Sequence, residues 1–162
     1  MEYKFPEELK LEAELIALAR HAKNAELMEA TKGSQFDRGK DKNFQVDYIG
    51  CLGELIARQY LRDNGKEFEF GELVQDRPSK EADITLNGNR IDVKSKANRG
   101  NLIEVNKRAH EKGLGLIDSY WFINIDEKTC TALFKTVSYA QVNQWKLHYY
   151  EKYKNHAYQN TI

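Results

Sequence analysis

A tight turn at Asn87-Gly88-Asn89 separates two short strand-like segments and limits how the middle of the chain can fold. The segments are Ala82–Leu86 and Arg90–Lys94, and each alternates apolar with polar residues as a half-buried strand does. Asn and Gly tolerate the positive φ angles that a short hairpin turn requires. The sequence therefore predicts an antiparallel hairpin that brings Asp83 and Asp92 onto neighbouring strands.

The rest of the chain divides into helical and strand-like stretches. The first helix carries an apolar stripe at helical spacing, made of Leu11, Leu15, Leu18 and Ala22. A polar loop is expected over residues 33–43. Helices are expected at residues 6–32, 46–63, 106–112 and 138–156, and strands besides the hairpin at 68–74, 120–125 and 131–135. This order predicts one α/β domain, residues 1–162, with a central mixed β-sheet flanked by helices.

The composition is that of a folded intracellular protein. The chain is 41% hydrophobic and 31% charged, no apolar run approaches the roughly 20 residues that cross a bilayer, and the first residues lack the pattern of a secretory signal. We therefore expect a cytoplasmic protein without a membrane partner. Its formal net charge is zero, which argues against a basic surface everywhere but leaves room for a local basic groove. Basic residues do concentrate between Arg90 and Lys112.

The cysteines and histidines give no sign of a zinc site. Cys51 and Cys130 belong to no CxxC pair, so both are expected to be small buried residues. The histidines are scattered without metal-ligand spacing, which predicts surface or tail positions for His21, His110, His148 and His156.

The hairpin carries the residues that indicate chemistry. Asp92 and Lys94 are two positions apart on one strand and therefore share a face, and the turn places Asp83 within reach of that face. Two carboxylates and an ammonium around one small volume suit a bound Mg²⁺, which relieves the repulsion between the acids. Such a cation can activate water for phosphodiester hydrolysis, and the lysine can orient the water and stabilise the developing charge.

These residues resemble the signature of the PD-(D/E)xK nuclease superfamily: an acid, here Asp83, followed on the next strand by Asp92-Val93-Lys94. The segment Gly50–Ala57 is similar to the family's preceding helix, with Glu54 as its acid. Two departures are Ala82 in place of the usual proline, and Asp rather than Glu at the middle acid.

The resemblance implies a restriction-endonuclease-like αβββαβ core over residues 46–135. The helical patterns outside it predict an N-terminal helical extension over 1–45 and a C-terminal helix over 136–162. The resemblance also implies catalysis by Glu54, Asp83, Asp92 and Lys94. The metal ligands would be Asp83, Asp92, Glu54 and the backbone carbonyl of Val93. The metal would be Mg²⁺, which Mn²⁺ replaces, and the substrate DNA, including branched or single-stranded forms. A nuclease of this size needs a homodimer, or several sites, to cut both strands.

Basic residues after the motif are candidates for substrate binding through phosphate contacts, namely Lys96, Arg99, Lys107 and Arg108. Near the end of the chain, tyrosines alternate with lysines. Two interpretations stay open for this segment: a stacking and charge surface for nucleic acid, or an amphipathic packing helix with a solvated basic side. The residues concerned are Tyr149, Tyr150, Tyr153, Tyr158, Lys146, Lys152 and Lys154.

Two alternative functions remain. The first is an active nuclease. The second is a catalytically inactive relative that binds nucleic acid or protein, and the missing proline and the neutral net charge motivate this alternative. A third hypothesis is an unrelated α/β protein in which Asp83, Asp92 and Lys94 form an exposed ion-pair ladder of small energetic value.

Overall fold

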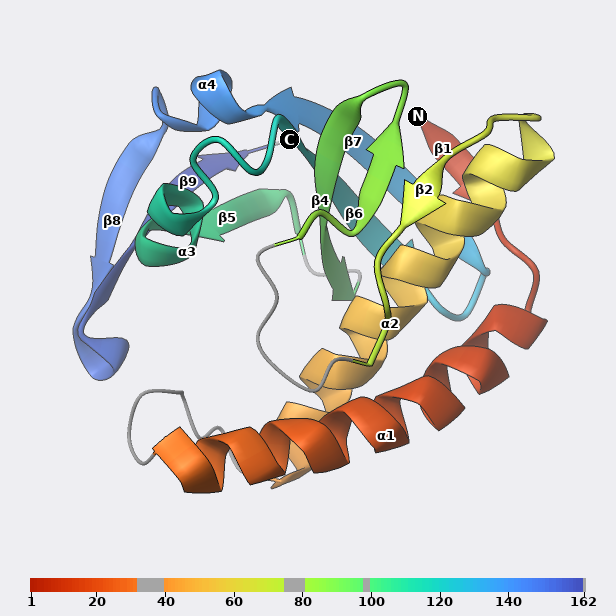
Figure 1. Ribbon diagram of the computed structural model, residues 1–162, viewed down its shortest axis with the longest axis horizontal. Coiled ribbons are helices and arrows are strands. Elements are labelled where there is room, and N and C mark those ends of the chain that lie inside the picture. Colours follow the sequence, from red (N-terminus) through yellow and green to blue (C-terminus); the bar gives the residue numbers. More distant parts are fainter. Residues whose placement is uncertain (32–39, 75–80, 98–99, 162) are drawn as a thin grey trace.

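The computed structural model describes residues 1–31, 40–74, 81–97 and 100–161, which form a mixed α/β fold with a curled mixed sheet (Figure 1). Its helices are α1 (Glu8–Thr31), α2 (Lys40–Asp63), α3 (Lys107–Lys112) and α4 (Tyr139–Val142), with a 3-10 turn η1 (Glu151–Tyr153). Its strands are β1 (Glu2–Lys4), β2 (Glu69–Phe70), β3 (Ile84–Leu86), β4 (Asn89–Ala97), β5 (Leu102–Asn106), β6 (Ser119–Asp126), β7 (Thr131–Ser138), β8 (Lys146–Tyr150) and β9 (Asn155–Thr161). The expected α/β class is confirmed.

The central sheet has six strands in the order β1-β7-β6-β4-β3-β2. β4 and β6 run parallel, and the other neighbours are antiparallel. Helix α2 covers one face and buries Leu52, Leu55 and Ile56 in one core with Ile91 and Val93 of β4. This arrangement leaves the other face of β4 for polar side chains.

The predicted hairpin is confirmed as β3 and β4. Leu86 pairs with Asn89, so Asn87 and Gly88 are the turn residues, with φ angles of 50° and 79°. Two positive φ values belong to the primed turns, whose twist matches that of paired strands. β4 runs to Ala97, beyond the expected end, because it also pairs with β6 along its length.

The prediction of a C-terminal helix, over residues 138–156 within a segment 136–162, is wrong. Only α4 is α-helical there, and β8 and β9, joined by the 3-10 turn η1, form a hairpin that joins β5 in a second sheet, ordered β5-β9-β8 (Figure 1). Trp145, Leu147 and Tyr149 recur at every second position, which is the strand period, and aromatic residues favour strands. Sequence analysis also missed β5, whose long-range pairing with β9 stabilises this hairpin.

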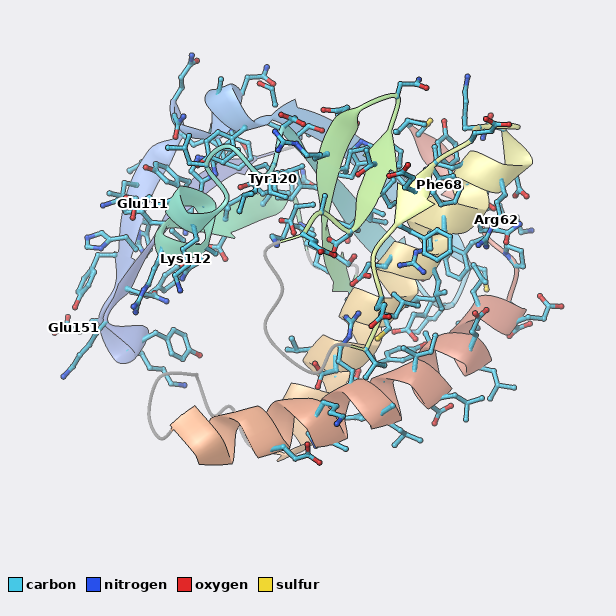
Figure 2. All side chains as sticks on the ribbon, viewed as in Figure 1. Arg62, Phe68, Glu111, Lys112, Tyr120 and Glu151 are labelled. Atoms are coloured by element: carbon cyan, nitrogen blue, oxygen red, sulfur yellow. The ribbon has the colours of Figure 1, made fainter. Side chains whose placement is uncertain are left out.

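A second core lies between the two sheets. Tyr120 and Phe122 of β6 pack there with Ile103 and Val105 of β5, and Figure 2 shows Tyr120 on the side of the central sheet that faces the second sheet. The alternate residues of β6, which include Trp121, lie in the core on the α2 side. β6 therefore separates two cores.

Helix α1 packs on α2 through a different side from its leucine stripe. Leu9, Ala13 and Ala17 are buried in the core with α2. The exposed fractions are 64%, 62% and 56% for Leu11, Leu15 and Leu18. The stripe is therefore a solvent-facing apolar surface on a well-packed helix.

Two further boundaries differ from expectation. α2 begins at Lys40, inside the stretch expected to be a loop, and residues 32–39 of that stretch lie outside the described residues. β1 was not predicted, and it pairs with the edge of β7. Among the described helices, none combines the length and apolar character needed to cross a membrane.

Candidate active site

Asp92 and Lys94 lie on the face of β4 that points away from α2. Their neighbours Ile91 and Val93 are buried against α2, so alternation along the strand turns Asp92 and Lys94 to the other side. The Lys94 Nζ and the Asp92 Oδ2 are 2.5 Å apart, and the two side chains are 39% and 21% exposed. The predicted acid–lysine pair is thus formed in a half-buried position.

Asp83 comes immediately before β3, at the point where the pairing of β3 with β4 ends. The last backbone pair joins Ile84 to Ile91. Beyond it, the Val93 N–H donates to the Asp83 Oδ2 at 2.7 Å. The carboxylate thus accepts the hydrogen bond that a backbone carbonyl would accept if β3 continued. This bond holds Asp83 beside the Asp92-Val93-Lys94 segment.

The charges of these side chains shift the pKa values of their neighbours. Burial, followed by the charges of Glu54 and Asp92, raises the pKa of Asp83 to about 8, against the lowering effects of Lys94 and the Val93 N–H. For Lys94, burial acts to lower the pKa, but the Asp92 and Asp83 charges outweigh it and raise the pKa. Carboxylates therefore outnumber the cation that neutralises them at this end of the hairpin.

Glu54 reaches the same region from α2. Gly53 makes this approach close, because a Cβ there would overlap the Ser95 Oγ and lie 2.5 Å from the Ser95 Cβ on β4. The Glu54 side chain is buried, and burial raises its pKa, with Arg20 and Arg58 opposing this and Asp92 adding to it. Gly53 therefore allows a close contact between α2 and β4 beside Glu54.

Two arginine side chains form ion pairs with the Glu54 carboxylate. Arg20 of α1 donates from its Nη2 to the Glu54 Oε1 at 3.0 Å, and from its Nε to the Leu73 carbonyl at 2.7 Å. The Arg58 Nη2 is 3.9 Å from the Glu54 Oε2. Sequence analysis missed Arg20, because nothing in its local pattern distinguishes it from a solvated basic residue of α1.

The acids were tested for their fit to a divalent cation. Within the described ranges, no group of three or more His, Cys, Asp or Glu side chains is arranged to hold a metal. Asp83 and Asp92 are carboxylates of the kind that Mg²⁺ uses, and Mg²⁺ needs only one or two of them because it keeps several waters. Burial and then the charges of Glu54 and Asp92 raise the pKa of Asp83, and a bound cation would relieve the part that is due to these charges. These two residues fit, whereas Glu54 is held by arginine.

The four residues expected to bind substrate are placed differently from one another. The Lys96 Nζ donates to the carbonyls of Gly100 and Leu102 at 2.6 and 2.7 Å, so it ties down the start of β5. Lys107 pairs with Glu111 at 3.3 Å on α3. Arg108 is exposed on the same helix. Arg99 lies outside the described residues.

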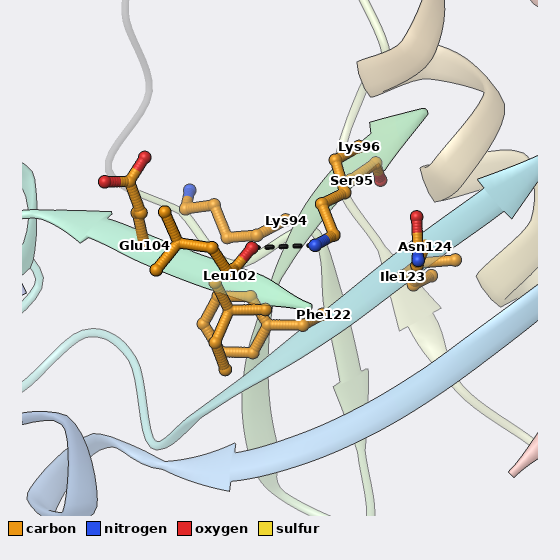
Figure 3. Close-up of a pocket in the computed structure, with 9 residues that line it drawn as sticks. Lys94, Ser95, Lys96, Leu102, Glu104, Phe122, Ile123 and Asn124 are labelled. Atoms are coloured by element: carbon orange, nitrogen blue, oxygen red, sulfur yellow. Dashed lines mark hydrogen bonds between the residues drawn. The ribbon is translucent and has the colours of Figure 1, made fainter. Parts of the chain in front are cut away.

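A pocket of about 180 Å³ opens beside Lys94, between β4, β5 and β6 (Figure 3). Lys94 and Glu104 line it, with Phe122 beneath them. The Asn124 Oδ1 also belongs to this pocket, and it is buried without a hydrogen-bond partner among the described residues. The pocket therefore lies between the hairpin and the second sheet, and its lining is partly polar and partly apolar.

His110 is buried, so its expected surface position is wrong. One ring nitrogen lies 2.7 Å from the Tyr120 hydroxyl and the other 2.8 Å from the Asn143 Oδ1, and the ring stacks on Tyr139. His148 and His156 are exposed, as expected. His110 therefore stabilises the second core as a satisfied polar group.

The cysteine predictions have a divided outcome. Cys51 is fully buried, and burial raises the pKa of its thiol to about 11, so it is an unreactive core residue. Cys130 is only half-buried, in the turn before β7, with a φ angle of 53°. Both cysteines are free thiols.

The structure thus brings Asp83, Asp92 and Lys94 together and places Glu54 beside them in contact with arginine. No family model matches the chain, and no curated protein matches its sequence. The chemistry of these side chains is therefore the basis for a functional assignment.

Proposed function

We propose that the protein is a Mg²⁺-dependent endonuclease that hydrolyses phosphodiester bonds in DNA. The observation that carries this proposal is the convergence of Asp83, Asp92 and Lys94 at one end of the β3–β4 hairpin, with the pKa of Asp83 raised to about 8. Acidic residues with such perturbed pKa values concentrate at functional sites. A stable fold alone gives no reason to crowd carboxylates in a half-buried position.

The order of elements supports the proposal. From α2 onward the chain forms β2, β3 and β4, then α3, then β6 beside β4. The order is similar to the αβββαβ order expected of a restriction-endonuclease-like core, with β5 as an additional strand before α3. The parallel pairing of β4 with β6 agrees with a helical crossover between them.

Asp83 and Asp92 would be the side-chain ligands of Mg²⁺, and Mn²⁺ would substitute for it. The Val93 carbonyl is a third ligand, because a strand residue directs its N–H and C=O toward the same neighbour and the Val93 N–H already bonds to Asp83. Glu54 would act on the metal only after its carboxylate leaves Arg20. When bound, the metal supplies an activated water and neutralises charge on the phosphate.

Lys94 is proposed to assist the attacking water. Its ammonium lies on the face it shares with Asp92, at the mouth of the pocket between β4 and β5. The carboxylates keep its pKa above the usual value, so it acts as a cation that orients water and stabilises the developing phosphorane charge.

The proposed partners are DNA and a second copy of the chain. Leu11, Leu15 and Leu18 are exposed on α1 at spacings of four and three residues, the spacing of a coiled-coil seam. Pairing of two such stripes would bury an apolar surface and provide two active sites for the two strands of a duplex.

Cleavage assays test the proposal. Supercoiled plasmid, a four-way junction and a single-stranded oligonucleotide are incubated with Mg²⁺ or Mn²⁺. We expect Lys94→Ala and Asp92→Asn to lower the rate by about 100-fold or more, while Lys128→Ala, in the turn between β6 and β7, leaves it unchanged. If the wild-type protein leaves all three substrates intact with either metal, the nuclease proposal fails.

One observation favours a second candidate, a non-catalytic module that binds nucleic acid or protein. Asp92 is already paired with Lys94, and Glu54 with Arg20, so protein cations neutralise two of the three acids without a metal. Calorimetry separates the candidates: salt-sensitive DNA binding without any Mg²⁺ or Mn²⁺ binding would support the module.

A further inference from the structure

The hairpin of β8 and β9 forms a basic, aromatic projection at the edge of the molecule. Figure 2 shows Glu151 at its outer tip, far from the central sheet. The chain has no net charge, yet the segment 146–156 holds three lysines and one glutamate. Its exposed side chains are Lys146, Leu147, His148, Tyr149, Glu151, Lys152, Tyr153, Lys154 and His156.

The tyrosines of this segment divide into two kinds. The Tyr150 hydroxyl bonds to Glu104 and Gln159, and Tyr158 packs against His110, so these two stabilise the second sheet. Tyr149 and Tyr153 are 49% and 36% exposed. Part of each ring therefore faces solvent, and the Tyr153 ring also lies 6.4 Å from that of Tyr150.

Each exposed tyrosine lies beside a second ring or a cation. The Tyr149 ring centroid is 4.8 Å from that of His156 across the hairpin. The Lys152 Nζ lies 5.4 Å from the centre of the Tyr153 ring, and Lys154 follows at the turn into β9. Rings that alternate with ammonium groups match a strand in which bases alternate with phosphates.

We propose that this hairpin binds single-stranded nucleic acid, with a base stacked on Tyr149 and phosphates contacting Lys152 and Lys154 at the adjacent tip. The inference rests on the proposed nuclease function and adds that the hairpin holds a single-stranded part of the nucleic-acid substrate. It selects a single strand because the bases of a duplex are already stacked and offer no faces to a tyrosine ring.

The binding assay separates stacking from charge. Fluorescence anisotropy with labelled oligo-dT and with an abasic phosphodiester of equal length is measured in EDTA, so that cleavage cannot interfere. We expect the protein to bind oligo-dT more tightly than the abasic strand. Tyr149→Ala should weaken binding of oligo-dT by about tenfold and leave abasic binding unchanged, whereas Tyr149→Phe retains the wild-type affinity.

The lysines should act on both probes alike. The Lys152→Ala, Lys154→Ala double variant is expected to weaken both and to reduce the slope of log affinity against log salt by roughly 1.4, because two phosphate contacts are lost. Lys128→Ala, at the opposite turn between β6 and β7, removes one exposed lysine and is the matched control. Circular dichroism shows whether each variant is folded.

Equal affinity for both probes, or no effect of Tyr149→Ala, would overturn the inference. A change of oligomeric mass in Tyr149→Ala would also overturn it. Such a change would show that Tyr149 of the wild-type protein contacts a second chain along the edge strand β8. Failure of the nuclease proposal looks different: the hairpin variants still change binding in EDTA, while no substrate is cut with metal present.

Discussion

The Asp83 carboxylate accepts a hydrogen bond from the backbone N–H of Val93 at 2.7 Å, although the two residues are ten positions apart and Asp83 lies just outside β3. In this bond a side-chain oxygen replaces the backbone carbonyl that would accept the N–H in a continued β3–β4 pairing. The bond holds an acid beside the Asp92–Lys94 pair, where burial and neighbouring carboxylates raise its pKa. The hairpin therefore keeps a poorly solvated acid at a fixed position.

Asp83→Asn should make the protein more stable near neutral pH in the absence of metal. The folded pKa of Asp83 is about 8, above its ordinary value of 3.8, so the folded state holds the proton longer than the unfolded chain. Its contribution is therefore fully present below pH 4 and is lost as the pH rises through 8. Asn stays neutral and still accepts from Val93. Urea unfolding at pH 5 and pH 8.5 should show a gain that is larger by about 1 kcal/mol or more at the higher pH, because the loss begins near pH 4 and is complete only above pH 8; an equal effect at both values would contradict the raised pKa.

Divalent metal should raise the melting temperature of the wild-type protein. A cation between Asp83 and Asp92 removes the repulsion that disfavours the ionised site, and a ligand that binds the folded state stabilises it. Thermal unfolding with Mn²⁺ or Mg²⁺, in place of EDTA, measures the shift. Asp92→Asn should abolish it and Glu54→Gln should leave most of it. A shift that persists in Asp92→Asn would place the metal elsewhere.

Gly53→Ala should destabilise the protein by roughly 1–3 kcal/mol, despite the better helix propensity of Ala. The added methyl group would overlap the Ser95 side chain on β4, so α2 must move away from the sheet. Denaturant unfolding checks this. Ser95→Gly in the same chain should recover most of the loss, and a Gly53→Ala protein as stable as the wild type would show that the contact is not close.

Leu15→Glu combined with Leu18→Glu should convert a dimer to a monomer, because charges would enter the apolar stripe of α1. Light scattering over a range of protein concentrations gives the mass. Leu114→Glu, at a residue 73% exposed after α3, is the control and should leave the mass unchanged. A wild-type protein that stays monomeric at all concentrations would rule out the stripe as a dimer interface.

The β3–β4 hairpin and the proximity of its acids could be predicted because both depend on local rules. Asn87 and Gly88 set the turn, and strand alternation places Asp92 and Lys94 on one face. By contrast, strand alternation predicts the face of the sheet on which a side chain lies, but not the groups that it contacts. The carbonyls of the Gly100–Leu102 segment that hold Lys96 were therefore not predicted.

The errors came from long-range contacts. The aromatic C-terminal segment is compatible with a helical pattern and with a strand pattern, and its pairing with β5, about fifty residues earlier in the chain, stabilises the strand. His110 gave no sequence signal of burial, because its partners Tyr120 and Asn143 lie on other elements. Arg20 is likewise recognisable only once α1 has packed beside Glu54.

Anomalous scattering from a crystal soaked in Mn²⁺ tests the central claim most directly. We predict a manganese peak between the Asp83 and Asp92 carboxylates, within about 2.0–2.3 Å of an oxygen of each, and the loss of that peak in Asp92→Asn. A saturating soak that shows no peak at the end of the β3–β4 hairpin would contradict the account.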